Sequence, residues 1–92
     1  MYLYLGPGAV TPYGDIVGIF DLDNTTQSHR TRAFLERAER SGQLTAVGDD
    51  IPKSFVVCAS KGNSGQKVWV VQPAPATLRG RVEQNALFDR RP

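Results

Sequence analysis

The first residues of the chain alternate between apolar and polar types, which predicts two short strands. Leu3 and Leu5 alternate with tyrosines, the pattern of a strand that buries one face. Residues 6–8 read Gly-Pro-Gly, a turn sequence, and residues 9–11 can form a second strand that Pro12 ends. We therefore expect two short strands separated by a turn.

The strand pattern is stronger over residues 15–22, 53–60 and 67–72, where apolar residues occupy both faces. Residues 44–47 give a weaker strand signal. The polar residues 61–66 separate the last two strands, which are predicted to form a hairpin with a loop longer than a tight turn. By strict alternation, the strand at 15–22 carries Ile16, Phe20 and Leu22 on one face and Val17 and Ile19 on the other.

The most regular helical pattern covers residues 29–41. Its apolar face repeats at positions i, i+3, i+4 and i+7 from Thr31 onward. Glu36 and Arg40 stand four residues apart in the favourable order, and Gly42 suits the position after the last turn. Each of three preceding polar residues can serve as the N-cap, namely Ser28, Thr26 and Asn24.

A second and weaker helix is predicted over residues 76–86, after Pro73 and Pro75 end the preceding strand. Gly80 weakens this prediction, because glycine inside a helix costs about 1 kcal/mol relative to alanine. The resulting fold class is α+β, a small mixed or antiparallel sheet with two helices. We expect one domain over residues 1–86, followed by a frayed basic tail over 87–92.

The strands bury apolar residues on both faces, but two helices suffice to cover roughly one face of the sheet. The other face, or the aromatic edge of the sheet, then needs a partner, and a second copy of the chain is the economical one. The alternative is a compact monomer whose second helix covers more of the sheet. The predicted interface residues are Tyr2, Tyr4, Val17, Ile19 and Trp69.

Length and composition describe one small domain, with 92 residues, 40% apolar residues and a net charge of +2. The charge is uneven, because residues 1–27 contain three aspartates and no lysine or arginine, while the remainder carries an excess of basic residues. No apolar run approaches the roughly 20 residues of a membrane helix, and the first residues lack a signal-peptide pattern. We expect a cytoplasmic protein without a membrane partner.

Residues that could carry catalysis or bind metal are few. The single cysteine, Cys58, lies in a strand pattern typical of a buried and unreactive thiol, and the single histidine, His29, opens a helix among arginines. Asp21 and Asp23 are better explained by a turn and a helix cap than by a cation site. The sequence therefore predicts no enzyme activity, no metal site and no cofactor.

Three sequence stretches together resemble the extracellular matrix regulator family of Gram-positive bacteria, RemA and RemB. They are DIVGIFD at 15–21, after an initial YLYLG, then PKSFVV at 52–57 and PAPATLRGR at 73–81, and the RemB branch is the more similar. The resemblance covers residues 1–82 and implies a small, cytoplasmic α+β protein. The RemA branch forms rings that bind DNA and activate genes for the biofilm matrix.

The residues that differ from the DNA-binding branch bear on where DNA would bind. At three positions where that branch has basic residues, this chain has aspartate: Asp15 at the start of the strand at 15–22, and Asp49 and Asp50 in the loop before the strand at 53–60. In the second of these places, residues 49–53, only Lys53 is basic. The resemblance thus implies a homo-oligomeric, DNA-binding regulator of transcription, while the aspartates favour a protein–protein adaptor or assembly module that does not contact DNA. Lys53 and, by their charge alone, the helix arginines Arg30, Arg32, Arg37, Arg79 and Arg81 are the candidate DNA-binding residues.

Overall fold

Two helices and two β-sheets make up the part of the chain that the computed structural model describes, residues 2–22, 28–59 and 65–89. Side chains are described up to Val82. The α+β class and the mixed sheet predicted from the sequence are confirmed. None of the described helices is both long enough and apolar enough to cross a membrane.

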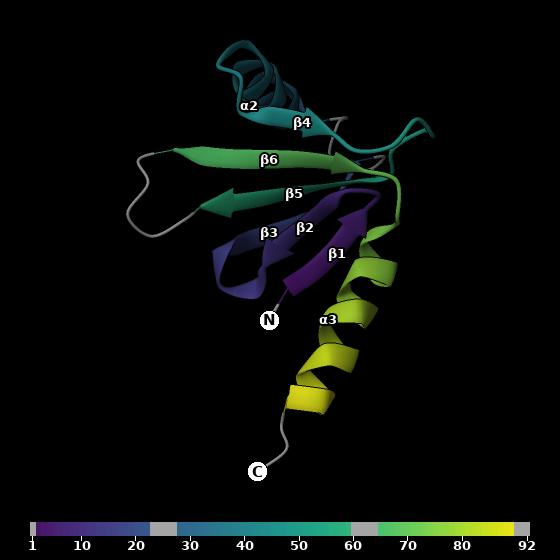
Figure 1. Cartoon of the computed structure of the whole chain (residues 1–92). Helices are drawn as coiled ribbons and strands as arrows, with labels where there is room; N and C mark the ends of the chain where they lie inside the picture. The colour runs from purple at the N-terminus through teal and green to yellow at the C-terminus, as the bar shows by residue number, and fades with distance from the viewer. Residues whose placement is uncertain (1, 23–27, 60–64, 90–92) are drawn as a thin grey trace.

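The larger sheet has four strands in the order β3-β5-β6-β4 (Figure 1). β5 pairs antiparallel with β3 on one side and with β6 on the other, whereas β4 pairs with β6 in parallel. The predicted β5–β6 hairpin is therefore present, and its loop residues 60–64 lie outside the described residues. The strand bounds are Ile16–Asp21 for β3, Leu44–Ala46 for β4, Ser54–Ala59 for β5 and Gln66–Val71 for β6.

The first two strands, β1 (Tyr2–Gly6) and β2 (Ala9–Pro12), form a separate antiparallel hairpin. Their inward residues Leu3 and Leu5 are completely buried, as the alternation predicts. After β2 the chain makes one turn of 3-10 helix, η1 (Tyr13–Asp15). Of its residues only Asp15 belongs to the strand predicted over 15–22, and β3 begins one residue later, at Ile16.

The predicted helix over 29–41 is α2 (His29–Arg40), with Ser28 as its N-cap residue. The other two candidate caps, Thr26 and Asn24, lie outside the described residues. Gly42 has a φ of 75°, which is the left-handed conformation that commonly ends a helix. Glycine adopts this conformation easily because it has no Cβ.

The last helix, α3 (Pro75–Asp89), begins one residue before the predicted segment and continues three residues past position 86. No glycine or proline stands between 86 and 89, so nothing in the local sequence stops the helix there. The predicted frayed tail thus begins in a helical backbone, and its last residues, 90–92, lie outside the described residues.

A β-bulge in β3 corrects the face assignment predicted from strict alternation. Ile16 pairs with Cys58 and Gly18 pairs with Val57, so Val17 is an extra residue between two pairs. The extra residue moves Ile16 to the face of Ile19 and places Val17 on the face of Phe20. Alternation alone could not detect the bulge, because every residue from 16 to 20 is apolar or glycine.

The two faces of the larger sheet carry two separate cores. On one face, Ala38 of α2 packs with Phe55, Val57 and Val68 of the sheet. On the other, Leu78 of α3 and the hairpin residues Leu3, Leu5 and Ala9 pack with Val56, Cys58 and Val71 of the sheet.

The sheet face opposite α2 is therefore covered within the chain, which differs from the expectation that it needs a partner. The sequence identified the strand with Leu3 and Leu5, but not that it lies across the sheet as a second layer. The open surface is found instead on the α2 side, over β3 and β5, where Val17 and Phe20 are exposed. Self-association stays a prediction, but the exposed apolar surface that could serve as its interface lies on the α2 side of the sheet.

Replacing Gly80 in α3 by alanine should stabilise the protein. A Cβ added at Gly80 would meet no atom within 4 Å, so the methyl group fits without strain. We expect Gly80→Ala to raise the free energy of unfolding by about 0.5–1 kcal/mol, measured by urea denaturation with the fluorescence of Trp69. An unchanged or lower stability would show that Gly80 does not lie in a regular helix.

Candidate binding groove

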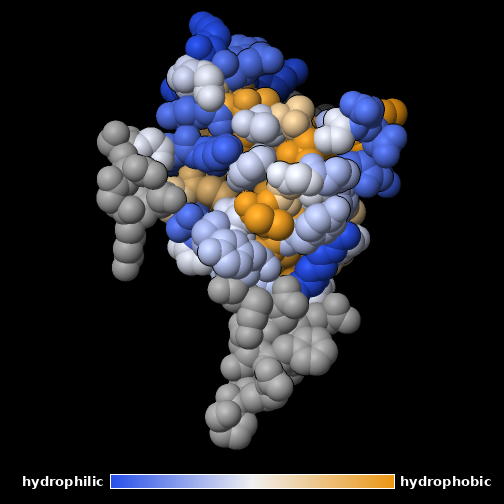
Figure 2. Space-filling view, viewed as in Figure 1, coloured by the Kyte–Doolittle hydropathy of each residue, from blue (hydrophilic) through white to orange (hydrophobic). Residues whose placement is uncertain are grey.

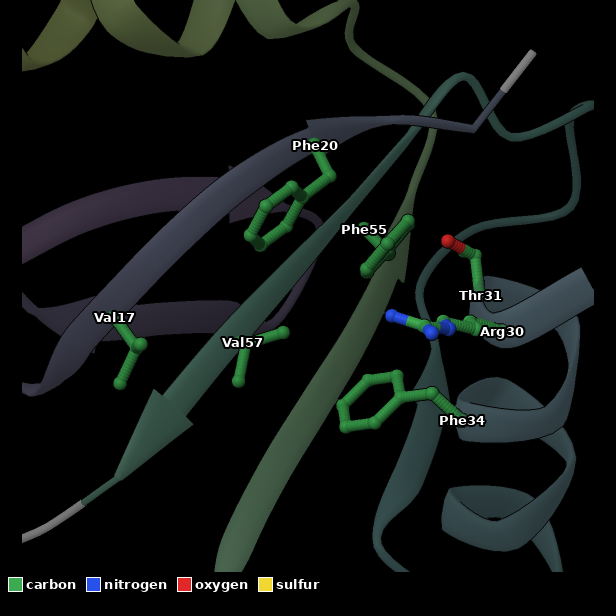
Figure 3. Close-up of a pocket in the computed structure, with 7 residues that line it drawn as sticks. All are labelled: Val17, Phe20, Arg30, Thr31, Phe34, Phe55 and Val57. Atoms are coloured by element: carbon green, nitrogen blue, oxygen red, sulfur yellow. The ribbon is translucent and has the colours of Figure 1, made fainter. Parts of the chain in front are cut away.

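An apolar groove lies between α2 and the β3–β5 half of the sheet (Figure 3). Its volume is about 330 Å³, and it opens where the bulged start of β3 faces the first turns of α2. Side chains from β3, α2 and β5 meet there, and these three elements lie far apart in the sequence. The described lining residues are Val17, Phe20, Arg30, Thr31, Phe34, Phe55 and Val57.

Three phenylalanines form the floor and one wall of the groove. The rings of Phe20 and Phe55 are stacked, with centroids 5.0 Å apart and an angle of 20° between their planes. Phe34 of α2 lies 6.5 Å from Phe55, tilted by 37°. Such ring pairs add stability beyond the area that they bury. Phe55 is thus held from both sides, and the aromatic floor is fixed in position.

Gly18 gives the Phe20 ring its position. A Cβ at Gly18 would lie 2.6 Å from two atoms of that ring, so the ring lies directly over the glycine. Only glycine leaves this space on the strand surface. The sequence contained a signal for this arrangement, a glycine two residues before a phenylalanine in one strand, but the groove itself was not predicted.

Arg30 is the one charged residue among the described residues that line the groove. Its guanidinium extends from α2 over the groove, toward the rings of Phe34 and Phe55 (Figure 3). Arg37 follows two helical turns later and lines a neighbouring hollow with Ser41, Gln43 and Gln66. The rim of the groove on the α2 side is therefore basic.

The two candidate arginines of α3 bind backbone carbonyls of strands. Arg79 donates a hydrogen bond from Nη2 to the carbonyl oxygen of Ile19 at 3.1 Å, and Arg81 donates one from Nη1 to that of Tyr4 at 2.9 Å. The guanidinium of Arg81 also lies 5.6 Å from the centre of the Tyr4 ring. The two arginines thus hydrogen-bond to carbonyl groups of β3 and β1 that could otherwise pair with a strand of another molecule. Covering such groups protects the edge of a sheet from unwanted pairing.

The predicted DNA-binding residues fall into separate groups. Arg30, Arg32 and Arg37 are exposed on α2, on one face of the sheet, while Arg79 and Arg81 belong to α3 on the other face. Lys53 is exposed just before β5, where its backbone N–H donates to the carbonyl of Val71. The fold does not bring these cations onto one continuous surface.

The predicted interface residues are also divided. Tyr2 and Tyr4 are exposed together on the outer face of the hairpin, where Figure 2 shows apolar surface framed by polar residues. Val17 lies in the groove. Ile19 and Trp69 are partly buried against the core on the α3 side of the sheet. The Lys67 ammonium lies 4.2 Å from the centre of the Trp69 ring. These five residues therefore do not form one patch.

Cys58 has the environment of an unreactive thiol. It is buried in β5, and its sulfur lies 3.5 Å from Oγ1 of Thr11. Burial raises the pKa of the Cys58 thiol above its ordinary value, and the hydrogen bond with Thr11 offsets this only in part. The thiol is therefore neutral near pH 7, and a neutral thiol is a poor nucleophile.

Among the described residues, no three histidine, cysteine or carboxylate side chains gather as a metal site would require. The groove, with its apolar floor and basic rim, is instead suited to binding a partner that combines apolar and acidic groups.

No model of a known protein family matches this chain. No curated protein matches it either. The resemblance to the extracellular matrix regulators stays a prediction from the three sequence stretches.

Proposed function

We propose that this protein is a cytoplasmic, self-associating regulator of extracellular matrix gene expression that contacts DNA through α2. The observation that carries the DNA contact is the exposure of Arg30, Arg32 and Arg37 on one helix at the surface of the domain. Arginines presented in this way can bind phosphate groups, and repetition of the helix in an assembly would add their weak contacts. The proposal includes no catalytic step.

The contrast between the two helices supports α2 as the DNA-contacting element. Arg79 and Arg81 of α3 hydrogen-bond strand carbonyls, so moving them to a phosphate would break existing contacts. Arg32 and Arg37 of α2 carry no comparable tie in the described structure. We therefore assign the phosphate contacts to α2 and a structural role to the α3 arginines.

The test compares two double variants that remove the same charge from opposite faces of the sheet. Arg32→Gln with Arg37→Gln should weaken binding to a long duplex by about tenfold at about 50 mM salt and lower the salt dependence by about 0.9 per lost contact. Fluorescence anisotropy with labelled duplex DNA over a salt series measures both quantities. The α2 substitutions lie on exposed positions, so the fold should persist.

Arg79→Gln with Arg81→Gln is the matched control. It should leave DNA affinity near that of the unsubstituted protein while lowering stability by about 1–2 kcal/mol, because two hydrogen bonds from charged donors are lost. Equal loss of affinity in the two variants would reject α2 as the binding element. An unsubstituted protein that does not bind DNA at all under these conditions would reject the DNA contact itself.

A second function, a protein–protein adaptor without DNA contact, is favoured by the exposed Asp49 and Asp50 beside Lys53. Carboxylates at this place would repel phosphate. Under this alternative, self-association survives while no duplex binds at low salt. The same titration therefore separates the two functions.

A further inference from the structure

The two edges of the four-stranded sheet differ in how far they are protected. On the β3 edge, the bulge at Val17 interrupts regular pairing, and Arg79 donates a hydrogen bond to the carbonyl oxygen of Ile19 at 3.1 Å. Bulges and covered carbonyl groups both keep a further strand from joining a sheet. β4 forms the opposite edge, beyond β6 (Figure 1), and in the described residues its outer side has neither of these features.

The backbone of β4 presents unpaired polar groups at this second edge. The carbonyl of Gln43 and the N–H of Val47 each bond to β6 at 2.9 Å. Successive residues of a strand point their backbone groups to opposite sides, so Thr45 also faces β6, whereas Leu44 and Ala46 face outward. In the part of the chain that the structure describes, no hydrogen bond is found at these outward groups.

The spacing of the outward groups suits a second copy of the same strand. β4 has only three residues, Leu44–Ala46, so its edge offers two bonding residues on either side of Thr45. A strand that runs antiparallel and has the same spacing bonds to both of them. Thr45 and Ala46 are exposed, so the edge is accessible.

We infer that two copies of this chain pair through β4, antiparallel, about a two-fold axis at Thr45. Leu44 of each copy then lies opposite Ala46 of the other, and the residues of each such pair exchange both of their N–H to carbonyl hydrogen bonds. The contact is isologous, so the dimer is closed. This inference rests on the self-association in the proposed function and assigns the surface that forms it.

The antiparallel direction also suits the acidic loop that follows β4. Asp49 and Asp50 are exposed in this loop. Parallel pairing would bring the aspartates of the two copies together, and like charges side by side are destabilising. Antiparallel pairing keeps them at opposite ends of the joined strands.

The same loop carries Ile51, which at 83% has the largest exposed fraction of the large apolar side chains described. The loop is fixed at both ends, because the N–H of Val47 bonds to β6 and the N–H of Lys53 donates to the carbonyl of Val71 at 3.0 Å. Antiparallel pairing brings this loop of each copy beside residues 41–43, the turn between α2 and β4, of the other. We therefore expect Ile51 to add an apolar contact to the backbone pairing.

The dimer places both α2 helices on one surface. The two-fold axis of an antiparallel strand pair is perpendicular to the sheet, so each face of the joined sheet keeps the same elements in both copies. α2 covers one face in each copy, and the two helices therefore lie on the same face of the dimer. Two helices that contact one duplex raise its affinity through their effective concentration. This is the repetition of α2 that the proposed function requires.

A cysteine at position 45 tests the register of the pairing. Thr45 lies opposite the same residue of the second copy in a pair without mutual hydrogen bonds, whose Cα atoms are about 4.5 Å apart in antiparallel sheets. This distance is within the range of a disulfide. Mild oxidation of Thr45→Cys should therefore convert most of the protein to a linked dimer, measured by electrophoresis without reducing agent. A Thr45→Cys protein that stays unlinked would overturn the inference.

Ala46→Cys is the matched control, because Ala46 is the exposed neighbour in the same strand but lies opposite Leu44. Its two copies would be more than about 7 Å apart, too far for a disulfide, so we expect about tenfold less linked dimer. The unsubstituted protein, whose only cysteine is the buried Cys58, should stay unlinked. Equal linking at positions 45 and 46 would contradict the register.

Ala46→Pro removes the outward N–H of β4 and leaves its bonds to β6 in place. Proline is tolerated in an edge strand where its nitrogen faces solvent. We expect a folded protein, checked by circular dichroism, with self-association weakened about tenfold or more. Light scattering coupled to gel filtration over a concentration series measures this. A folded variant that associates as the unsubstituted protein does would contradict the inference, and if the variant does not fold, the cysteine pair decides.

Val17→Asp tests the other exposed surface, because Val17 is 64% exposed on the edge strand β3. It should leave the dimer unchanged. If Val17→Asp disrupts the dimer while Ala46→Pro does not, the interface is the apolar groove and the inference is wrong.

The outcomes separate this inference from the proposed function. A monomeric unsubstituted protein contradicts both the inference and the self-association, whereas the DNA titration with the α2 variants reports on DNA contact alone. A dimer that persists in Ala46→Pro, with no linking at position 45, contradicts only the surface assigned to β4.

Discussion

Replacing Phe55 by alanine should remove about 3–5 kcal/mol from the free energy of unfolding, the largest effect expected of any single substitution in the groove. Phe55 is 4% exposed and packs between the rings of Phe20 and Phe34. Its removal leaves a cavity beneath both rings. Small domains have total stabilities of about 5–15 kcal/mol, so the variant should be close to unfolding at room temperature. Urea denaturation followed by Trp69 fluorescence measures the loss.

Phe20→Ala is the matched comparison, because Phe20 belongs to the same stacked pair but is 39% exposed. We expect it to cost only about 1–2 kcal/mol. A folded Phe20→Ala protein then makes it possible to study the groove without its outer aromatic ring. Equal losses in the two variants would contradict the view that Phe55 supports the fold and Phe20 mainly shapes the surface.

Replacing Leu78 by alanine should detach α3 from the sheet. Leu78 is completely buried in the core on the α3 side, so its truncation should cost about 2–5 kcal/mol. The other described ties of this helix are weaker: the partly buried Val82, the hydrogen bonds from Arg79 and Arg81, and the one that the Tyr13 hydroxyl donates to the carbonyl of Arg81 at 3.3 Å.

Hydrogen exchange measured by NMR tests this expectation. In Leu78→Ala the amides of α3 should lose protection more than those of β5 and β6, because the helix is held at one edge of the core. Thr77→Ala, at the exposed neighbouring position, should change stability by no more than about 0.5 kcal/mol. Protection that is lost uniformly over the whole chain would show that α3 and the sheet unfold as one unit.

Most of the secondary structure could be predicted from local sequence. The α2 helix follows from a regular apolar face ended by Gly42, and the strands follow from alternating or continuous apolar runs between turn residues. The bounds of α3 were less accurate, because the only strong punctuation near its end is Pro92. The bulge at Val17 was missed, because a run of apolar residues looks the same with or without an extra residue.

The candidate site was far less predictable. Val17 and Arg30 were selected from the sequence for separate reasons, as an interface residue and as a cation, and the fold places both in one groove. Phe20, Phe34 and Phe55 fall within the strands predicted over 15–22 and 53–60 and the helix predicted over 29–41, but no local pattern indicates that they meet. Their meeting depends on strand order, since β3 pairs with β5 across more than thirty residues of sequence.

The roles of the basic residues were equally hard to predict from the sequence. In the sequence, Arg79 and Arg81 are charged helix residues like the arginines of α2. In the structure they donate hydrogen bonds to carbonyl groups of β3 and β1. These contacts join residues 60 and 77 positions apart, so no local pattern indicates them.

By itself the sequence determined the elements, the α+β class and the uneven charge, because these depend on propensity and periodicity within a few residues. Only the tertiary structure decided which face of the sheet each element covers. It moved the open apolar surface from the face opposite α2 to the groove beside α2, because the β1–β2 hairpin folds over the sheet and a bulge turns Val17 outward. Layer packing and strand register join distant residues, and that is the information that local patterns do not contain.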